Sequence, residues 1–182
     1  MKKQSFLLLI SLFLFSLTAE VCNAHSQKIS AETKLKELGI NLIEPVALTA
    51  NFVKAVRIGQ LVYLSGHGPD KQEGGQITGK LGSDLSIEQG QEAARLVGIS
   101  LLSTLKKETG DLNKVKRIVK VLGMVNAVPA FTSHSQVING FSDLMVQVFG
   151  ENGKHARSSV GVGSLPGNIP VEIEMIVELK LK

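Results

Sequence analysis

HARSSVGVGSLPGNIPVEIE, residues 155–174, joins two runs of β-favouring residues through a turn rich in Gly and Pro. The pattern predicts one strand over residues 158–162 and a longer one over residues 171–181. The longer run alternates, so one face carries Val171, Ile173, Met175, Val177, Leu179 and Leu181. Its other face carries Glu172, Glu174, Ile176 and Glu178. The chain therefore ends in a strand with one core face and one half-polar face.

Arg157 lies where the first of these strands begins, followed by small side chains. Arginine keeps its proton inside a protein, so burial at this position has to be compensated by an anion. The candidates are Glu172, Glu174 and the carboxylate of a ligand. By periodicity alone either glutamate qualifies, because both lie on the same face of the last strand. This stretch is the first place to look for chemistry.

Two amphipathic helices precede this stretch, with a strand between them. The first begins at Ser86, which has capping-box spacing to Gln89, and ends at Gly110. The second spans residues 135–149, where apolar side chains repeat at helical intervals. Between them, residues 117–125 are rich in β-branched side chains and predict a central strand.

The first part of the chain predicts shorter elements. Residues 31–38 form a short helix that Gly39 ends, and residues 52–56 and 61–64 form two antiparallel strands. Residues 58–60 are their tight connection. The following segment, 67–85, is rich in Gly and charge and predicts a loop, with a short extended piece at 76–78.

The order of elements is two strands, a helix, a strand, a helix and two strands. This order predicts an α+β domain with a mixed sheet and both helices on one face. Two helices cannot cover both faces of the sheet. A half-polar open face is typical of an oligomer interface or a pocket wall, so we expect a homo-oligomer.

The first 24 residues have the pattern of a secretory signal peptide. A cationic start precedes an apolar run at residues 6–17, which is shorter than the roughly 20 residues of a membrane span. Cleavage is expected after Ala24, giving a periplasmic or secreted protein without a membrane partner. The alternatives are an uncleaved anchor and a lipoprotein anchored at Cys22, but Glu20 and Val21 fit a lipobox poorly.

Composition excludes several classes of function. Residues 25–50 form an N-terminal extension with the short helix, and residues 51–182 form one domain. The only cysteine lies in the signal segment, so thiol chemistry and thiolate metal sites are excluded for the mature chain. Without residues 1–24 the net charge is +3, too mild to predict a nucleic-acid partner. Three histidines of the mature chain lack metal-ligand spacing: His67, His134 and His155.

Several motifs occur together in one order along residues 52–181. They are LSGHGP at 64–69, SIEQGQEAAR at 86–95, GDL at 110–112, VING at 137–140, and HARSSVGVGSLP followed by VEIE. With these motifs the chain resembles the reactive intermediate/imine deaminase family, also called RidA or YjgF. Within the family it is most similar to a branch with HGP and VING motifs.

The resemblance implies a chorismate-mutase-like fold and a homotrimer with a pocket at each subunit boundary. Family members hydrolyse 2-aminoacrylate and related enamines or imines to 2-keto acids and ammonia, and they need no cofactor. The residue matching the family's carboxylate-binding arginine is Arg157, and the one that positions the attacking water is Glu172. Asn139 matches a pocket asparagine, and His67, after the LSG strand end, is expected to border the pocket.

Two positions depart from the best-studied members. Ser159 replaces a cysteine, and a serine still donates a hydrogen bond. Phe52 replaces a tyrosine and has no hydroxyl to orient substrate or water. Both are kept as substrate-binding candidates. An imine deaminase is the first hypothesis, and a non-catalytic trimer that binds small carboxylates or acts as a chaperone-like module is the second.

Two further alternatives remain open at this point. Arg157 and Glu172 can form a structural ion pair between strands instead of a ligand site. A ribonuclease is the third functional hypothesis, although no basic aromatic surface supports it. Ser158 and Ser159 are expected to make local hydrogen bonds and not to act as nucleophiles, since no histidine with an orienting acid is evident nearby.

Overall fold

The computed structural model describes residues 30–45 and 50–181, so the predicted signal peptide lies outside the described residues. The described helices are α2 (Ala31–Glu37), α3 (Ile87–Thr109) and α4 (His134–Phe149). The described strands are β1 (Ala55–Ile58), β2 (Leu61–His67), β3 (Val115–Asn126), β4 (Ala156–Val162) and β5 (Val171–Leu179). Three short 3-10 turns lie at η1 (Leu112–Lys114), η2 (Gly150–Gly153) and η3 (Pro166–Asn168).

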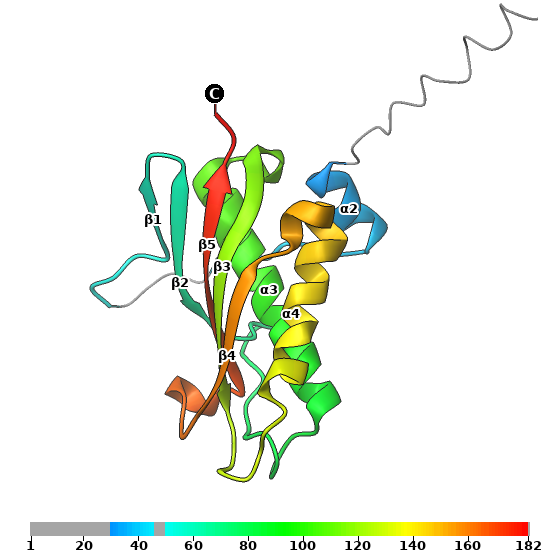
Figure 1. The fold of residues 1–182 in the computed structure, drawn as a ribbon, viewed down its shortest axis with the longest axis vertical. Helices are drawn as coiled ribbons and strands as arrows, with labels where there is room; N and C mark the ends of the chain where they lie inside the picture. The colour runs from blue at the N-terminus through cyan, green and yellow to red at the C-terminus, as the bar shows by residue number, and fades with distance from the viewer. Residues whose placement is uncertain (1–29, 46–49, 182) are drawn as a thin grey trace, which may run out of the picture.

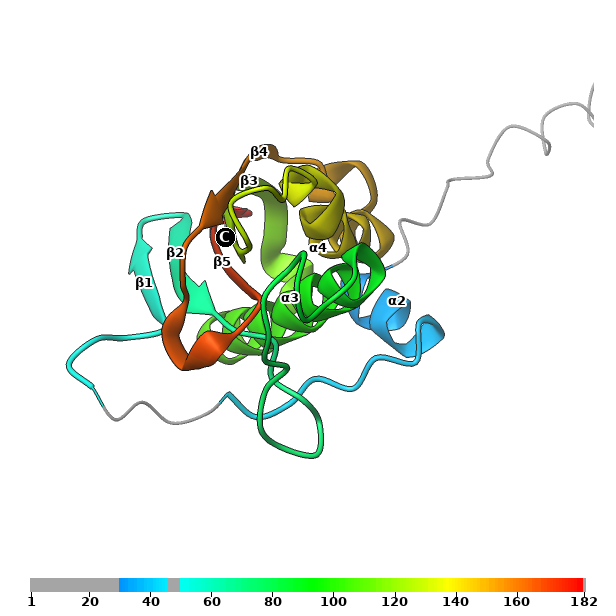
Figure 2. The same ribbon diagram turned by 90° about the horizontal axis from the view of Figure 1, so that it is seen from below.

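The five strands form one mixed sheet in the order β1-β2-β5-β3-β4 (Figure 1). β3 and β4 are parallel, and every other pair is antiparallel. A parallel pair needs a crossover, and α4 supplies it between β3 and β4. α3 and α4 pack side by side on one face of the sheet (Figures 1 and 2). The predicted α+β architecture, with a mixed sheet and two helices on one face, is confirmed.

The helices form where the local signals place them. Ser86 accepts from the backbone of Gln89 while the Gln89 side chain caps the Ser86 backbone in return, and Gly110 ends α3 with a left-handed φ of 76°. Gly140 allows α4 to approach α3 closely, because a Cβ there would overlap the backbone of Gln91. None of the helices in the described part of the chain is long and apolar enough to span a membrane.

The first and last strands differ from the predicted ranges. β1 spans Ala55–Ile58 instead of residues 52–56, because its regular ladder with β2 runs from the Ala55–Leu64 pair to the Ile58–Leu61 pair. β5 ends at Leu179 and not at 181, since its neighbours β2 and β3 start opposite its last residues. Leu181 is consequently 80% exposed and does not belong to the core. The predicted extended piece at 76–78 is reduced to a single bridge between Asp70 and Gln76.

The face of the sheet away from the helices is partly apolar. We call it the open face. It carries Val56, Ile58 and Tyr63 on β1 and β2, Ile176 on β5, Leu122 and Met124 on β3, and Val160 on β4. Tyr63 is 40% exposed, Val56 48% and Ile58 64%, which is unusual for side chains of this size. The expected half-polar, half-apolar face is therefore present, and Glu172 and Glu174 lie on it.

Candidate functional site

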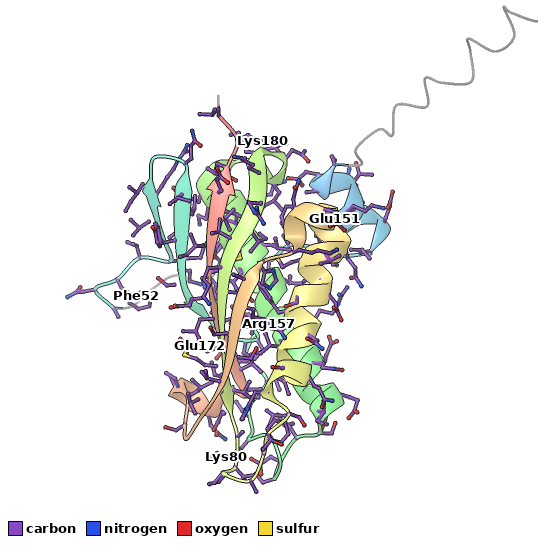
Figure 3. The ribbon with its side chains drawn as sticks, viewed as in Figure 1. Phe52, Lys80, Glu151, Arg157, Glu172 and Lys180 are labelled. Atoms are coloured by element: carbon purple, nitrogen blue, oxygen red, sulfur yellow. The ribbon has the colours of Figure 1, made fainter. Side chains whose placement is uncertain are left out.

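Arg157 lies on the edge strand β4, and its side chain is on the helix-covered face of the sheet. Its register partner on β3 is Val121, which is fully buried. The Arg157 Nη1 donates to Oδ1 of Asn139 at 3.0 Å and to Oγ of Ser142 at 2.9 Å. Nη2 donates to the carbonyl of Ser135 at 3.4 Å. The guanidinium thus joins β4 to α4 (Figure 3).

All of these partners are neutral. Within the described residues Arg157 forms no ion pair with a carboxylate, and none of these residues accepts a hydrogen bond from its Nε. A guanidinium has five N–H groups, so the Nε hydrogen and one Nη2 hydrogen remain for another acceptor. A carboxylate accepts such a pair through its two oxygens. Arg157 is therefore a half-buried cation whose charge the described residues do not neutralise.

Ser159 lies two residues further along β4 on the same helix-covered side. Its register partner is Gly123, and a Cβ on Gly123 would overlap Ile138 of α4. The Ser159 hydroxyl oxygen is buried and has no hydrogen-bond partner in the described part of the chain. A buried hydroxyl without a partner is costly unless something else binds it. Three predicted site residues, Arg157, Asn139 and Ser159, therefore lie together where β4 meets α4.

Glu172 lies elsewhere, on β5. Its register partner is Met124, and it is half-buried on the open face. A Cβ on Gly66 would overlap the Glu172 carboxylate, so the glycine of the LSG motif leaves room for this side chain. Burial raises the pKa of the Glu172 carboxyl, and the like charge of Glu174 raises it further. Glu172 is thus a carboxylate that binds a proton more readily than an exposed glutamate does.

Arg157 and Glu172 consequently lie on opposite faces of the sheet. An interpretation of the two as a pair on one exposed face of the sheet is therefore wrong. Arg157 shares its face with Val121 and α4, whereas Glu172 shares its face with Met124. The interpretation as a structural ion pair within one chain fails for the same reason.

Phe52 is also separated from Arg157. It precedes β1, at the edge of the sheet opposite β4, and 53% of its surface is exposed (Figure 3). It lies on the segment held to β2 by the hydrogen bond from the Ser65 hydroxyl to the carbonyl of Val53, at 2.7 Å. A single chain therefore does not bring Phe52 to the guanidinium.

His67 lies in the interior and, within one chain, is separated from Arg157 by the strands β5 and β3. The bulge in β2 turns it toward α3, and only 4% of it is exposed. Its Nδ1 donates to the carbonyl of Ser65 at 2.7 Å, so its Nε2 accepts from the hydroxyl of Thr104 at 2.8 Å. Burial lowers the pKa of His67, against the opposing effect of the Ser65 hydrogen bond. Both ring nitrogens are used to hold β2 on α3.

Sequence reasoning missed two residues at this site. Ser142 contacts Arg157 directly, and His155 contacts Ser142. The spacing of Ser142 to Asn139, one helical turn, and of His155 to Arg157, two residues along an extended chain, was available as a signal. Ser142 shares a face of α4 with Asn139, and His155 lies on the same side of the extended chain as Arg157. Only the fold shows that these two faces are in contact.

The arrangement supplies two chemical functions at two places. The junction of β4 and α4 offers a cation and a hydroxyl to a carboxylate, and the open face offers a carboxylate that can accept a proton. Among residues 30–45 and 50–181, no three His, Cys, Asp or Glu side chains gather in a group that could hold a metal ion.

A mixed five-stranded sheet with two helices on one face, and an arginine held where its edge strand meets a helix, defines a small α+β domain of the chorismate-mutase-like class. Residues 32–179 match the sequence profile of the YjgF/chorismate mutase-like family. The description of that family also names endoribonuclease activity. The chain belongs to the RidA/YjgF family.

Relatives cover most of the chain. Protein TCP17 of Trypanosoma cruzi is 44% identical over 146 residues, which are 80% of this chain and 91% of that protein. The crystal structure of Atu1372 from Agrobacterium tumefaciens, a protein of unknown function, is 41% identical with a TM-score of 0.76, covering 82% of this chain and 94% of the other. A Shewanella oneidensis protein named as an endoribonuclease is 29% identical with a TM-score of 0.80, covering 83% and 100%.

Proposed function

We propose that this protein binds small 2-imino acids, or the enamines from which they form, and hydrolyses them to 2-keto acids and ammonia. The observation that carries the proposal is the half-buried Arg157 guanidinium, whose hydrogen-bond partners are all neutral and whose Nε has no acceptor among the described residues. The buried Ser159 hydroxyl on the same face, which has no hydrogen-bond partner among the residues that the structure describes, supports a second hydrogen bond to the same ligand.

In this proposal Arg157 binds the substrate carboxylate and fixes the adjacent imine carbon in space. The oxygen of a water attacks that carbon, and Glu172 accepts the proton that the water loses. The imine nitrogen takes up that proton as the C–O bond forms, which gives a carbinolamine. The proton of its hydroxyl then passes to the nitrogen, the C–N bond breaks, and ammonia leaves as the keto group forms. The raised pKa of Glu172 suits this role, since a general base works best with a pKa near the working pH.

The two groups must then come from different copies of the chain, because Arg157 and Glu172 lie on opposite faces of one sheet. We propose a homotrimer in which the open face of one copy brings Glu172 to the β4 edge of the next. The exposed apolar side chains of the open face support an interface there. Phe52 reaches the site in the same way, from the neighbouring copy.

Phe52 favours a second candidate function, a trimer that binds small carboxylates without catalysis or acts as a chaperone-like module. Phenylalanine has no hydroxyl to orient a water. A ribonuclease is less well supported, because His67 and His155 each use both ring nitrogens for contacts within the chain. Binding of a small carboxylate by Arg157 is common to the deaminase and to the non-catalytic trimer.

The test generates 2-aminoacrylate in situ and follows release of pyruvate with wild type, Arg157→Ala and Glu172→Ala. Wild type should accelerate release, and each variant should lose most of that acceleration, by about 10²- to 10⁴-fold for the general base. Lys154→Ala is the matched control, because Lys154 is exposed and, among the described residues, forms an ion pair with Glu151 alone. No acceleration by pure wild type, with pyruvate still bound, would favour the non-catalytic binder.

A further inference from the structure

A continuous chain of hydrogen bonds continues behind Arg157. Its Nη1 donates to Ser142 Oγ at 2.9 Å, Ser142 Oγ lies 3.1 Å from His155 Nε2, and His155 Nδ1 lies 2.7 Å from the carbonyl of Gly153. A carbonyl only accepts, so Nδ1 carries a hydrogen, and in the neutral ring Nε2 is then the acceptor. The Ser142 hydroxyl therefore donates to His155 and accepts from Arg157. The donor and the acceptor of each of these hydrogen bonds are therefore fixed.

The far end of this chain is anchored in the fold. The His155 ring packs edge-on against the buried ring of Phe141, with centroids 5.8 Å apart and planes at 69°. Gly153, whose carbonyl holds Nδ1, packs so tightly on the last turn of α4 that a Cβ would overlap the backbone at Met145. The imidazole is thus held by a helix and by a 3-10 turn at once.

The surroundings of the His155 ring favour its neutral form. Burial lowers the pKa of His155, the hydrogen bond to Gly153 opposes this, and the nearby charge of Arg157 lowers it further. Of the other charged groups close by in sequence, Lys154 pairs with Glu151 on η2. The neutral form is the one that can accept from Ser142.

We propose that Ser142 and His155 are positioning residues: they hold the Arg157 guanidinium in the orientation that leaves its Nε edge free for a carboxylate. The effect of this positioning on the affinity of the site for a carboxylate rests on the proposed function. Nη1 is occupied on both hydrogens, by Ser142 and by Asn139, and therefore cannot turn to the ligand. Removing Ser142 or the acceptor on His155 frees the guanidinium to adopt other orientations.

The experiment compares Ser142→Ala, Ser142→Thr and His155→Phe with wild type. ¹⁵N NMR of the Arg157 side chain reads the rotation of its guanidinium without any ligand, and pyruvate titration reads the affinity. We expect faster rotation and about tenfold weaker pyruvate binding in Ser142→Ala and His155→Phe. Ser142→Thr keeps the hydroxyl and should restore both values, and Lys154→Ala should leave both unchanged.

Two further readouts make the result decisive. Wild-type His155 should show the Nδ1–H tautomer by ¹⁵N NMR, and acidification through its pKa should alter the Arg157 signals in wild type but not in His155→Phe. Unchanged guanidinium rotation in a folded Ser142→Ala variant overturns the inference. If wild type binds no pyruvate, the proposed function fails, while the rotation and tautomer measurements still decide whether Ser142 and His155 position Arg157.

Discussion

At the scale of single residues, the surroundings of Arg157 distinguish between the two roles considered for it. A structural arginine on a strand is neutralised by a carboxylate, whereas this one is held by an amide, a hydroxyl and a carbonyl. Neutral partners orient the guanidinium but leave its charge for a ligand. The site therefore provides a planar guanidinium with N–H donors in fixed directions, and not a positive charge alone.

Replacing Arg157 tests this directly. Arg157→Ala should weaken pyruvate binding by about 10- to 100-fold, the amount expected from losing charge-assisted hydrogen bonds. Arg157→Lys keeps the positive charge but lacks the planar pair of N–H donors, and should recover only part of the affinity for pyruvate. Calorimetric titration measures both. Equal affinities for Arg157→Lys and wild type would show that charge alone is enough.

Glu172 gives a prediction for stability against pH. Its pKa is raised in the folded chain by burial and by Glu174, so the ionised form is disfavoured there and protonation is favoured. The stability gained by protonation is present below the unfolded pKa, about 4.3, and is lost as the pH rises through the raised folded pKa. Glu172→Gln should therefore melt at a higher temperature than wild type at neutral pH.

The same comparison at pH below 4 should show no difference between Glu172→Gln and wild type. The control is Glu73→Gln, which removes an equal charge from an exposed loop. Thermal unfolding of the three proteins across this pH range checks the prediction. An advantage of Glu172→Gln that persists unchanged in acid would rule out the protonation of Glu172 as its cause.

At the scale of elements, the contact between α3 and α4 depends on a glycine. Gly140 lies against the backbone of Gln91, and no flexible side chain is available there to move aside. Gly140→Ala should destabilise the protein by about 1–3 kcal/mol through overpacking. Urea unfolding measures this, with Gly163→Ala as the control, because a Cβ at Gly163 meets open space.

The elements also show how far sequence reasoning reaches. The start and end of α3 were predictable because Ser86 and Gly110 are local signals. The face that each site residue occupies was not. Alternation orders side chains within a strand, but β4 and β5 are separated by β3, so their relative phase depends on register.

The bulge in β2 illustrates the same limit. Regular alternation from Leu64 would direct Gly66, and not His67, toward the helices. The extra residue reverses this and buries the histidine against Thr104. A bulge is a local break in pairing, and glycine near a strand end is only a weak sign of one. His67 was therefore assigned to the pocket from its motif alone.

At the scale of the whole molecule, the proposed shared site allows a mixing test. Arg157→Ala and Glu172→Ala should each be inactive alone. Unfolding and refolding them together in equal amounts should restore about a quarter of the wild-type activity, since each site of a cyclic trimer takes one residue from each of two neighbours. The control mixes each variant with the double variant, which should restore nothing. No recovery in a mixed trimer would contradict the shared site.

The first 24 residues concern the fate of the whole molecule. We propose that residues 1–24 direct the chain to the periplasm or the medium and are then removed. Sequencing the N-terminus of exported protein should begin at His25. Material that begins at Met1, or that only detergent releases, would contradict the proposal.

The exposed valine, isoleucine and tyrosine side chains of the open face have a further consequence under the export proposed above. In the proposed assembly, dilution separates the copies and with them the two halves of every site. Turnover per chain would then fall at low protein concentration even with saturating substrate. The strength of subunit association would set how far from its source the protein still works.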